Sequence, residues 1–286
     1  MTDDENSSNL VWKDRGIKCL KYVDDCLSIE KINFRKRRIG LASCVKACKT
    51  QSHYETVSYN ARNRGMKLNE AKTKMICVSA ARSYKPKANI NAGDNNNIET
   101  ADLPLRVLGF YFGTEPNVKA NMSVLQRKFK SRIWALRHLK QNGFKQGELV
   151  QVYKTMIRPV AEYCSSVFHA LITKADSYEL ERIQMQALKV IFGWDLSYEK
   201  LMEMSGVEKL SVRREESFVK LAKKMSENKR FSSWFPLRLY RAGVDIRRKE
   251  KYKVYRASTG RCLNSPLNLM RRRLNEMQVE TDAGIN

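Results

Sequence analysis

Short alternating runs of apolar residues near the start of the chain give way to long helical stripes further on. Around the pair Asp24-Asp25, within residues 18–29, apolar residues alternate on both sides, which predicts two strands joined by a turn. A helical pattern follows over residues 42–64 and ends at Gly65, because glycine readily adopts the left-handed conformation that closes many helices. The chain is therefore expected to open with a hairpin and a helix.

Three further segments complete the part of the chain in which we expect strands. Residues 74–79 and residues 105–112 are mostly apolar, and each predicts a strand. Between them, residues 82–101 are polar and contain glycine, a composition typical of a loose hairpin loop.

After Pro116 the apolar residues recur at steps of three and four, the period of an amphipathic helix. The first stripe stops at Gly143. It consists of Val118, Met122, Leu125, Phe129, Ile133, Leu136 and Leu139.

The remaining helices are marked by their expected ends. A second helix begins near Gly147, and Pro159 should kink or divide it. A third opens at Asp176, where Asp176 and Glu179 resemble a capping box. Another is expected over about residues 213–228.

These patterns predict an α+β chain in which the β structure precedes an all-α bundle. We expect a disordered N-terminus over residues 1–16, a β-containing domain over 17–113, a helical domain over 114–240 and a basic, weakly structured extension over 241–286.

Positive charge is concentrated in the helical part. The 286 residues include 54 Lys and Arg but 30 Asp and Glu, so the net charge is +24 and the pI is near 9.8. Residues 116–160 contain 10 basic residues and 1 acid, Glu148. A solubilising surface would intersperse the two signs, so this segment favours an acidic polymer or an anionic surface as partner.

Other features indicate an intracellular protein. No run of about eighteen apolar residues is present to cross a membrane, and the acidic N-terminus is unlike a signal peptide. The 7 cysteines are scattered without paired CxxC spacing, which argues against a disulfide framework and a zinc site. The run Arg35-Lys36-Arg37-Arg38 suits a nuclear localisation signal or a phosphate contact, and a solvated loop is the slightly favoured alternative.

The adjacent carboxylates of Asp24 and Asp25 are the leading candidates for chemistry. At the tip of a hairpin they repel each other, and a divalent cation between them and a phosphate would relieve that repulsion. Aspartate is also a common turn residue, so on these two residues alone a structural role is an equal alternative.

The order of motifs along the chain favours the metal-binding interpretation. The hairpin Tyr22-Val23-Asp24-Asp25 is followed by Gly65–Thr73 (GMKLNEAKT), Val107–Tyr111 (VLGFY) and basic helices containing Tyr153–Val160 (YKTMIRPV). This series, over about residues 17–240, resembles the C-terminal half of a reverse transcriptase of the non-LTR (LINE- or jockey-like) retrotransposon class. The resemblance implies that 17–113 is part of an antiparallel palm and 114–240 a thumb-like bundle.

In that family the YxDD turn is motif C of the palm. The resemblance therefore implies that Asp24 and Asp25 are catalytic and bind Mg²⁺, with Tyr22 beside the nucleic acid. Transfer of a nucleotide uses two ions about 3.5–4 Å apart, which need clustered carboxylates on a rigid turn. The implied activity is that of an RNA-directed DNA polymerase, a nucleotidyltransferase acting on dNTPs and an RNA or DNA primer–template duplex.

Two further segments match family motifs around the palm. The stretch Gly65–Thr73 resembles motif D, which implies that Lys72 protonates the leaving pyrophosphate; an exposed loop lysine is an equal alternative. Leu108 and Gly109 fall where the family grips the primer, since glycine allows close approach of the backbone to the strand. A simple strand bulge is the alternative there.

The family's thumb lies along the minor groove of the primer–template duplex. The basic face of residues 117–141 suits that role, because phosphate contacts by cations give affinity without sequence choice. The candidate contacts are Arg127, Lys128, Lys130, Arg132, Arg137 and Lys140.

The match also lacks parts that the family's catalytic site needs, an aspartate from motif A and the nucleotide-positioning motif B. No strand ending in such an aspartate precedes Tyr22, and Asp3, Asp4 and Asp14 are poor substitutes. We therefore expect a truncated retroelement fragment that holds Mg²⁺ poorly and is inactive alone. The alternatives are a non-catalytic, basic, helical nucleic-acid-binding protein and, less favoured, a protein with an acidic protein partner.

Overall fold

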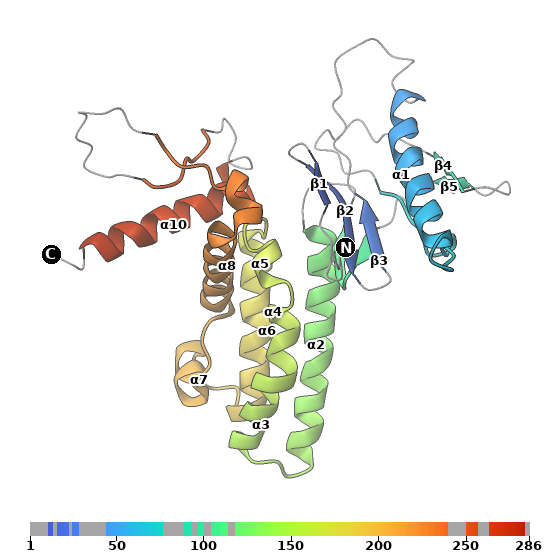
Figure 1. Cartoon of the computed structure of the whole chain (residues 1–286). Helices are drawn as coiled ribbons and strands as arrows, with labels where there is room; N and C mark the ends of the chain where they lie inside the picture. Colours follow the sequence, from blue (N-terminus) through green and yellow to red (C-terminus); the bar gives the residue numbers. More distant parts are fainter. Residues whose placement is uncertain are drawn as a thin grey trace. The chain divides into compact units, whose positions relative to one another are not determined.

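The α+β class is confirmed, since the chain forms small antiparallel sheets and a larger set of helices (Figure 1). The computed structural model describes residues 11–13, 16–22, 25–28, 44–76, 89–92, 97–99, 104–113, 118–239, 250–256 and 263–283. The chain divides into two compact units. The first comprises residues 1–105 and 113–116, and the second residues 106–112 and 117–286.

The first unit contains the predicted hairpin. Strand β2 (Gly16–Tyr22) pairs antiparallel with β3 (Asp25–Ser28) in a register that sets Tyr22 opposite Asp25, and β1 (Val11–Lys13) pairs with the other edge of β2. The strand–turn–strand prediction around the acidic pair is confirmed for these strands. Asp24 itself lies outside the described residues, and so does the basic run at residues 35–38.

Helix α1 (Cys44–Arg62) matches the helix expected in this unit. Gly65 has φ +72° and follows the last turn, where the Met66 N–H donates to the Ala61 carbonyl, so it closes the helix as predicted. The expected strand at 74–79 is described only as far as residue 76, and it makes a β-bridge at Met75.

The segment 82–101, expected to be a loose hairpin loop, contains a short hairpin formed by β4 (Asn89–Asn91) and β5 (Asn97–Glu99). The Gln51 side chain on α1 binds the backbone of Asn91 twice, accepting from its N–H at 2.8 Å and donating to its carbonyl at 2.9 Å. This pair of hydrogen bonds fastens the hairpin to α1, which no hydrophobic pattern indicates.

The single strand expected over residues 105–112 is instead a tight hairpin of β6 (Leu105–Val107) and β7 (Phe110–Phe112). Its turn residues Leu108 and Gly109 have φ +47° and +82°, as two-residue hairpin turns of type I′ require. The hairpin belongs largely to the second unit. The boundary expected at residue 113 thus differs from the observed division, near residue 105.

The second unit is a helical bundle. Helices α2 and α6 pack side by side within it (Figure 1). Its large side chains with 0% exposure include Phe129, Tyr153 and Phe168. The first helices in chain order are α2 (Lys119–Gln141), α3 (Gln146–Val152), α4 (Arg158–Glu162), α5 (Ser165–Phe168), α6 (Lys174–Phe192), α7 (Tyr198–Ser205) and α8 (Leu210–Glu227).

Pro159 divides a helical run, as predicted. Between α3 and α4 lies a π-helical turn, η1 (Tyr153–Ile157), and Pro159 is the second residue of α4. Because proline has no N–H to donate, the regular hydrogen-bond series is interrupted and one wide turn absorbs the mismatch.

The predicted start of α6 is corrected. The capping residue is Thr173, whose hydroxyl accepts from the Asp176 N–H at 3.0 Å and donates to the Asp176 carboxylate at 2.7 Å. Asp176 therefore lies three residues after the N-cap residue and is not itself the N-cap, and the Glu179 carboxylate pairs with Lys130 and Arg182.

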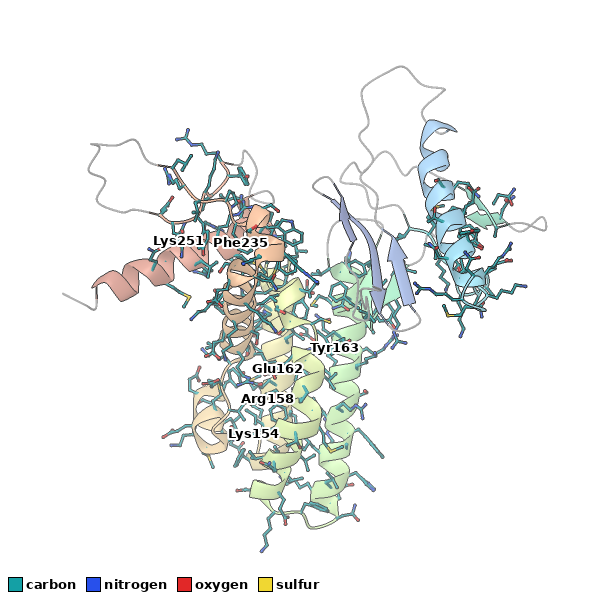
Figure 2. The ribbon with its side chains drawn as sticks, in the orientation of Figure 1. Lys154, Arg158, Glu162, Tyr163, Phe235 and Lys251 are labelled. Carbon is teal, nitrogen blue, oxygen red and sulfur yellow. The ribbon has the colours of Figure 1, made fainter. Side chains whose placement is uncertain are left out.

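The C-terminal part contains more regular structure than the weakly structured extension that we expected over 241–286. Helix α10 (Pro266–Ala283) and the extended residues 250–256 form a second core with α8 and the 3₁₀ turn η2 (Lys229–Trp234). The core contains Phe218, Phe235, Tyr252 and Met270. Figure 2 labels Phe235 and Lys251 in this region.

Two asparagines on α10 hold the extended segment by its backbone. The Asn275 amide accepts from the Tyr252 N–H at 2.9 Å and donates to the Tyr252 carbonyl at 3.0 Å. Asn268 does the same to Tyr255, at 3.2 and 3.1 Å. Seven residues of helix and three residues of extended chain both span about 10 Å, so the two clamps match in spacing.

Candidate nucleic-acid interface

Helix α2 separates an apolar face from a cationic one. The predicted stripe is confirmed: Met122, Leu125, Phe129, Ile133 and Leu136 are buried. The same 23-residue helix carries seven Lys and Arg residues and no acid. A helix with one buried face and unbalanced positive charge elsewhere presents a surface suited to an anionic polymer.

The six cations predicted on this helix separate into two groups, and Lys130 belongs to the group with an internal partner. Its Nζ lies 2.7 Å from a carboxylate oxygen of Glu179 on α6. Arg182 donates two hydrogen bonds to the same carboxylate, at 2.7 and 2.9 Å. These bonds from Arg182, together with that from Lys130, lower the pKa of Glu179 to about 2. Lys130 therefore joins α2 to α6.

Lys140 also has an internal role. Its Nζ donates to the carbonyls of Val190 and Ile191, at 2.8 and 3.2 Å, in the last turn of α6. These carbonyls have no partner further along the helix, and the negative end of the helix dipole favours a cation there. Lys140 stabilises the end of α6 and is a weaker candidate for phosphate contact than the sequence indicated.

The other four predicted cations, Arg127, Lys128, Arg132 and Arg137, are exposed. None of the four forms an ion pair with a carboxylate in the described part of the chain. A cation without a nearby acid retains its full attraction for an external phosphate, whereas a paired one must first lose its partner. Together they surround the exposed side of α2, with Lys128 and Arg137 on opposite flanks of it, and we call these four residues the α2 cationic face.

An aromatic pair on the exposed side of α2 was missed by the sequence reasoning. Trp134 is 67% exposed, and its ring lies against that of His138 with centroids 5.2 Å apart and planes 9° apart. The helical period could have shown that Trp134 is exposed, because Trp134 lies between the buried Ile133 and Leu136 in sequence but on the opposite side of the helix.

One of the basic residues that follow α2 in segment 116–160, Arg158, is balanced by an acid within the bundle. Lys154, Arg158 and Glu162 succeed one another along the helical run from η1 into α4 (Figure 2). The Arg158 Nε lies 3.6 Å from the Glu162 carboxylate, and Arg213 on α8 donates to that carboxylate as well. The charge of this part of 116–160 is thus partly neutralised, unlike the α2 cationic face.

The turn at Leu108 and Gly109 is fixed to the helical unit by Tyr163, at the end of α4 (Figure 2). The Tyr163 hydroxyl donates to the Leu108 carbonyl at 2.5 Å. A Cβ atom added at Gly109 would lie 3.1 Å from the Tyr163 hydroxyl oxygen. Any residue other than glycine at position 109 would therefore require the Tyr163 ring to move. Sequence reasoning found the turn residues but not Tyr163, which no pattern connects to them.

The bundle that carries these surfaces has a polar network in its interior. The Tyr153 hydroxyl donates to Gln184 at 2.5 Å, and Gln184 donates to the Tyr198 hydroxyl at 2.8 Å. Tyr198 in turn donates to Glu181 at 2.6 Å, and Glu181 accepts from the Ser211 N–H at 2.7 Å at the start of α8. Burial raises the pKa of both tyrosine hydroxyls, so both stay protonated donors.

The acidic pair and Lys72 belong to the first unit. Asp25 begins β3, its side chain lies outside the described residues, and the motif's other aspartate does too. Lys72 is exposed in a turn, where its backbone N–H donates to the Asn69 side chain at 3.1 Å. Among the described residues no three His, Cys, Asp or Glu side chains gather as metal ligands.

Comparisons with protein-family models, with curated proteins and with solved structures gave no match. In the part of the chain that the structure describes, none of the helices combines the length and apolar character needed to span a bilayer.

Proposed function

We propose that this chain is a fragment of an RNA-directed DNA polymerase of the non-LTR retroelement class, consisting of part of the palm with its YVDD hairpin and a thumb-like bundle. In this proposal the bundle binds a primer–template duplex. The fragment does not polymerise by itself. Two features of different origin support the proposal: the order of motifs along the sequence and the charge distribution on α2.

The observation that carries the proposal is the α2 cationic face. Arg127, Lys128, Arg132 and Arg137 are exposed on one regular helix and lack carboxylate partners among the described residues. Lys130 and Lys140, by contrast, contact Glu179 and the last turn of α6. Each of these cations that meets a phosphate releases condensed counterions, and this release favours binding.

Polymerisation is not expected because the metal site would be incomplete. Asp24 and Asp25 supply carboxylate oxygens, the ligand type that Mg²⁺ prefers. Two ions bridging a nucleotide need a further carboxylate opposite the hairpin. The resemblance does not extend to a segment that would supply this carboxylate, so we expect residues 1–286 not to polymerise.

The first experiment measures binding of a labelled RNA–DNA primer–template duplex across a range of salt concentrations. We expect log Kd to depend linearly on log salt. Combined Gln substitutions at Arg127, Lys128 and Arg132 should reduce the slope by about 2 to 3, since each lost phosphate contact removes roughly 0.9.

The matched control removes the same charge elsewhere, by combined Gln substitutions at Lys220, Lys223 and Lys224, which are exposed on α8. If both triple variants weaken binding equally, net charge and not the α2 cationic face determines affinity, and the proposal fails. Lack of duplex binding by the unchanged chain at low salt would also refute it.

A second experiment tests the catalytic half of the proposal by primer extension with Mg²⁺ and dNTPs. We expect no extension by residues 1–286. Measurable synthesis that disappears in Asp25→Ala would overturn the expected inactivity while supporting the assignment of the hairpin to a polymerase palm.

A second candidate function is a non-catalytic nucleic-acid-binding protein. The observation in its favour is that the helical unit has its own closed core around Phe129, Tyr153 and Phe168, so its binding face needs nothing from the acidic hairpin. The two candidates differ in the effect of Mg²⁺. A gain in duplex affinity with Mg²⁺ that is lost when Asp24 and Asp25 are changed to Asn favours the polymerase fragment, and an unchanged gain favours the second candidate.

A further inference from the structure

The Trp134–His138 pair is the largest exposed aromatic feature on α2. Its two rings are nearly parallel, 9° apart, with centroids 5.2 Å apart, and 67% of Trp134 is exposed. Single exposed aromatic residues are common on protein surfaces. A tryptophan already stacked on a second ring is different, because its orientation is restricted before any partner arrives and less freedom is lost on binding.

The charge around the pair restricts the chemistry of a partner. Arg137 lies one turn from Trp134, and Arg127 lies two turns away on the same side, about 10 Å along the helix axis. No acidic residue occurs anywhere in α2. A partner that satisfies both features must present a flat ring face and negative charge on one molecule, and nucleic acid does so with its base and phosphates.

The pair further distinguishes between the forms of nucleic acid. In a continuous duplex each base is covered on both faces by its neighbours, so an aromatic side chain on a rigid helix has no free face to stack on. An unpaired base in a single strand or an overhang has such a face. Phosphate contacts alone would not make this distinction.

We propose that Trp134, backed by His138, is a stacking platform for an unpaired nucleobase, and that Arg127 and Arg137 bind the adjoining phosphates. The α2 surface thereby holds single-stranded nucleic acid next to the duplex. This inference rests on the proposed nucleic-acid function and specifies which part of the substrate this face recognises.

The test uses two single-stranded oligonucleotides of equal length, one of thymidines and one in which every base is missing. Trp134→Ala should weaken binding of the thymidine strand about 5- to 150-fold, the range for loss of one stacked base. It should leave binding of the abasic strand unchanged, because the phosphates are the same. Trp134→Phe should retain most of the affinity for the thymidine strand.

The matched control is Tyr178→Ala, which removes an aromatic side chain that is 71% exposed but lies on α6 near Asp176 and Glu181. Its affinity for both strands should equal that of the unchanged chain. Circular dichroism of every variant verifies that the helices remain folded, and Trp134→Phe separates the loss of a ring from a general disturbance of the surface.

The outcomes separate this inference from the function on which it rests. If the unchanged chain binds neither oligonucleotide nor duplex at low salt, the proposed function fails. If it binds them and Trp134→Ala has the same affinity for the thymidine strand, the stacking platform is refuted while the cationic face stands. Equal weakening of thymidine and abasic strands would likewise refute stacking.

Discussion

Gln184 is the residue whose replacement should most sharply test how the bundle is held together. It is completely buried, with 0% exposure, and connects three elements. Its carbonyl oxygen accepts from Tyr153, and its amide nitrogen donates to the Tyr198 hydroxyl at 2.8 Å and to the Glu208 carbonyl at 2.9 Å. Gln184→Leu keeps the volume of the side chain nearly constant and removes all three hydrogen bonds.

The expected loss follows from which partners are left without a bond. The Tyr153 hydroxyl, on a side chain with 0% exposure, would have no acceptor, which costs about 1–3 kcal/mol. The Glu208 carbonyl is closer to solvent and adds less, and Tyr198 still donates to Glu181. We therefore expect the free energy of unfolding to fall by about 2–4 kcal/mol.

Guanidinium unfolding followed by far-ultraviolet circular dichroism measures this change. The matched control is Gln186→Leu, on the same helix but only half-buried, which should alter the free energy of unfolding by less than about 0.5 kcal/mol. The double variant Gln184→Leu with Tyr153→Phe should lose about 1–2 kcal/mol less free energy of unfolding than the two single variants lose in sum, because it has no buried hydroxyl without an acceptor. A Gln184→Leu protein as stable as the control, or strictly additive losses, would refute the reasoning.

Three further substitutions test other contacts of the bundle and the C-terminal region. Arg182 lowers the pKa of the Glu179 carboxyl to about 2 in the folded state, so the ionised carboxyl stabilises the fold above about pH 4.5 and this stabilisation is lost as the pH falls toward 2. Glu179→Gln should therefore lower the unfolding midpoint at pH 7, and the midpoints of the variant and the unchanged chain should converge as the pH is lowered to 2. Lys140→Met should destabilise the bundle by about 0.5–1.5 kcal/mol through the end of α6, whereas Arg137→Met should not, as thermal unfolding would reveal. Asn275→Ala should expose the extended segment 250–256 to limited proteolysis while α2 and α6 stay protected, and equal protection of that segment would contradict the clamp.

Local patterns in the sequence were sufficient for several elements. The alternation on both sides of the acidic pair predicted β2 and β3, because a period of two is a property of the strand itself. The stripe from Met122 to Leu136 predicted both the existence of α2 and its buried face, since one helix face must leave water. Gly65 and Pro159 marked helix ends correctly because their effects on the backbone are local.

The candidate interface was predicted only in part. The sequence located an excess of cations on α2 but did not sort them, since whether a lysine is free depends on acids and carbonyls brought in from elsewhere in the chain. Lys130 meets Glu179 and Lys140 meets the end of α6 across about fifty residues of sequence. Only the packing of α2 against α6 decides that, among the described residues, Lys130 and Lys140 have such partners while the four residues of the α2 cationic face do not.

What the sequence determined by itself was periodic or confined to neighbouring residues: the hairpin strands, the amphipathic helices and the sign of their charge. What the tertiary structure decided were pairings of single side chains with distant backbone groups. Tyr163 on the turn at Gly109 and Asn275 on the backbone of Tyr252 are such pairings. Hydrogen bonds of this kind depend on the position of two atoms to within a few tenths of an ångström, and that precision arises only once the hydrophobic faces have packed.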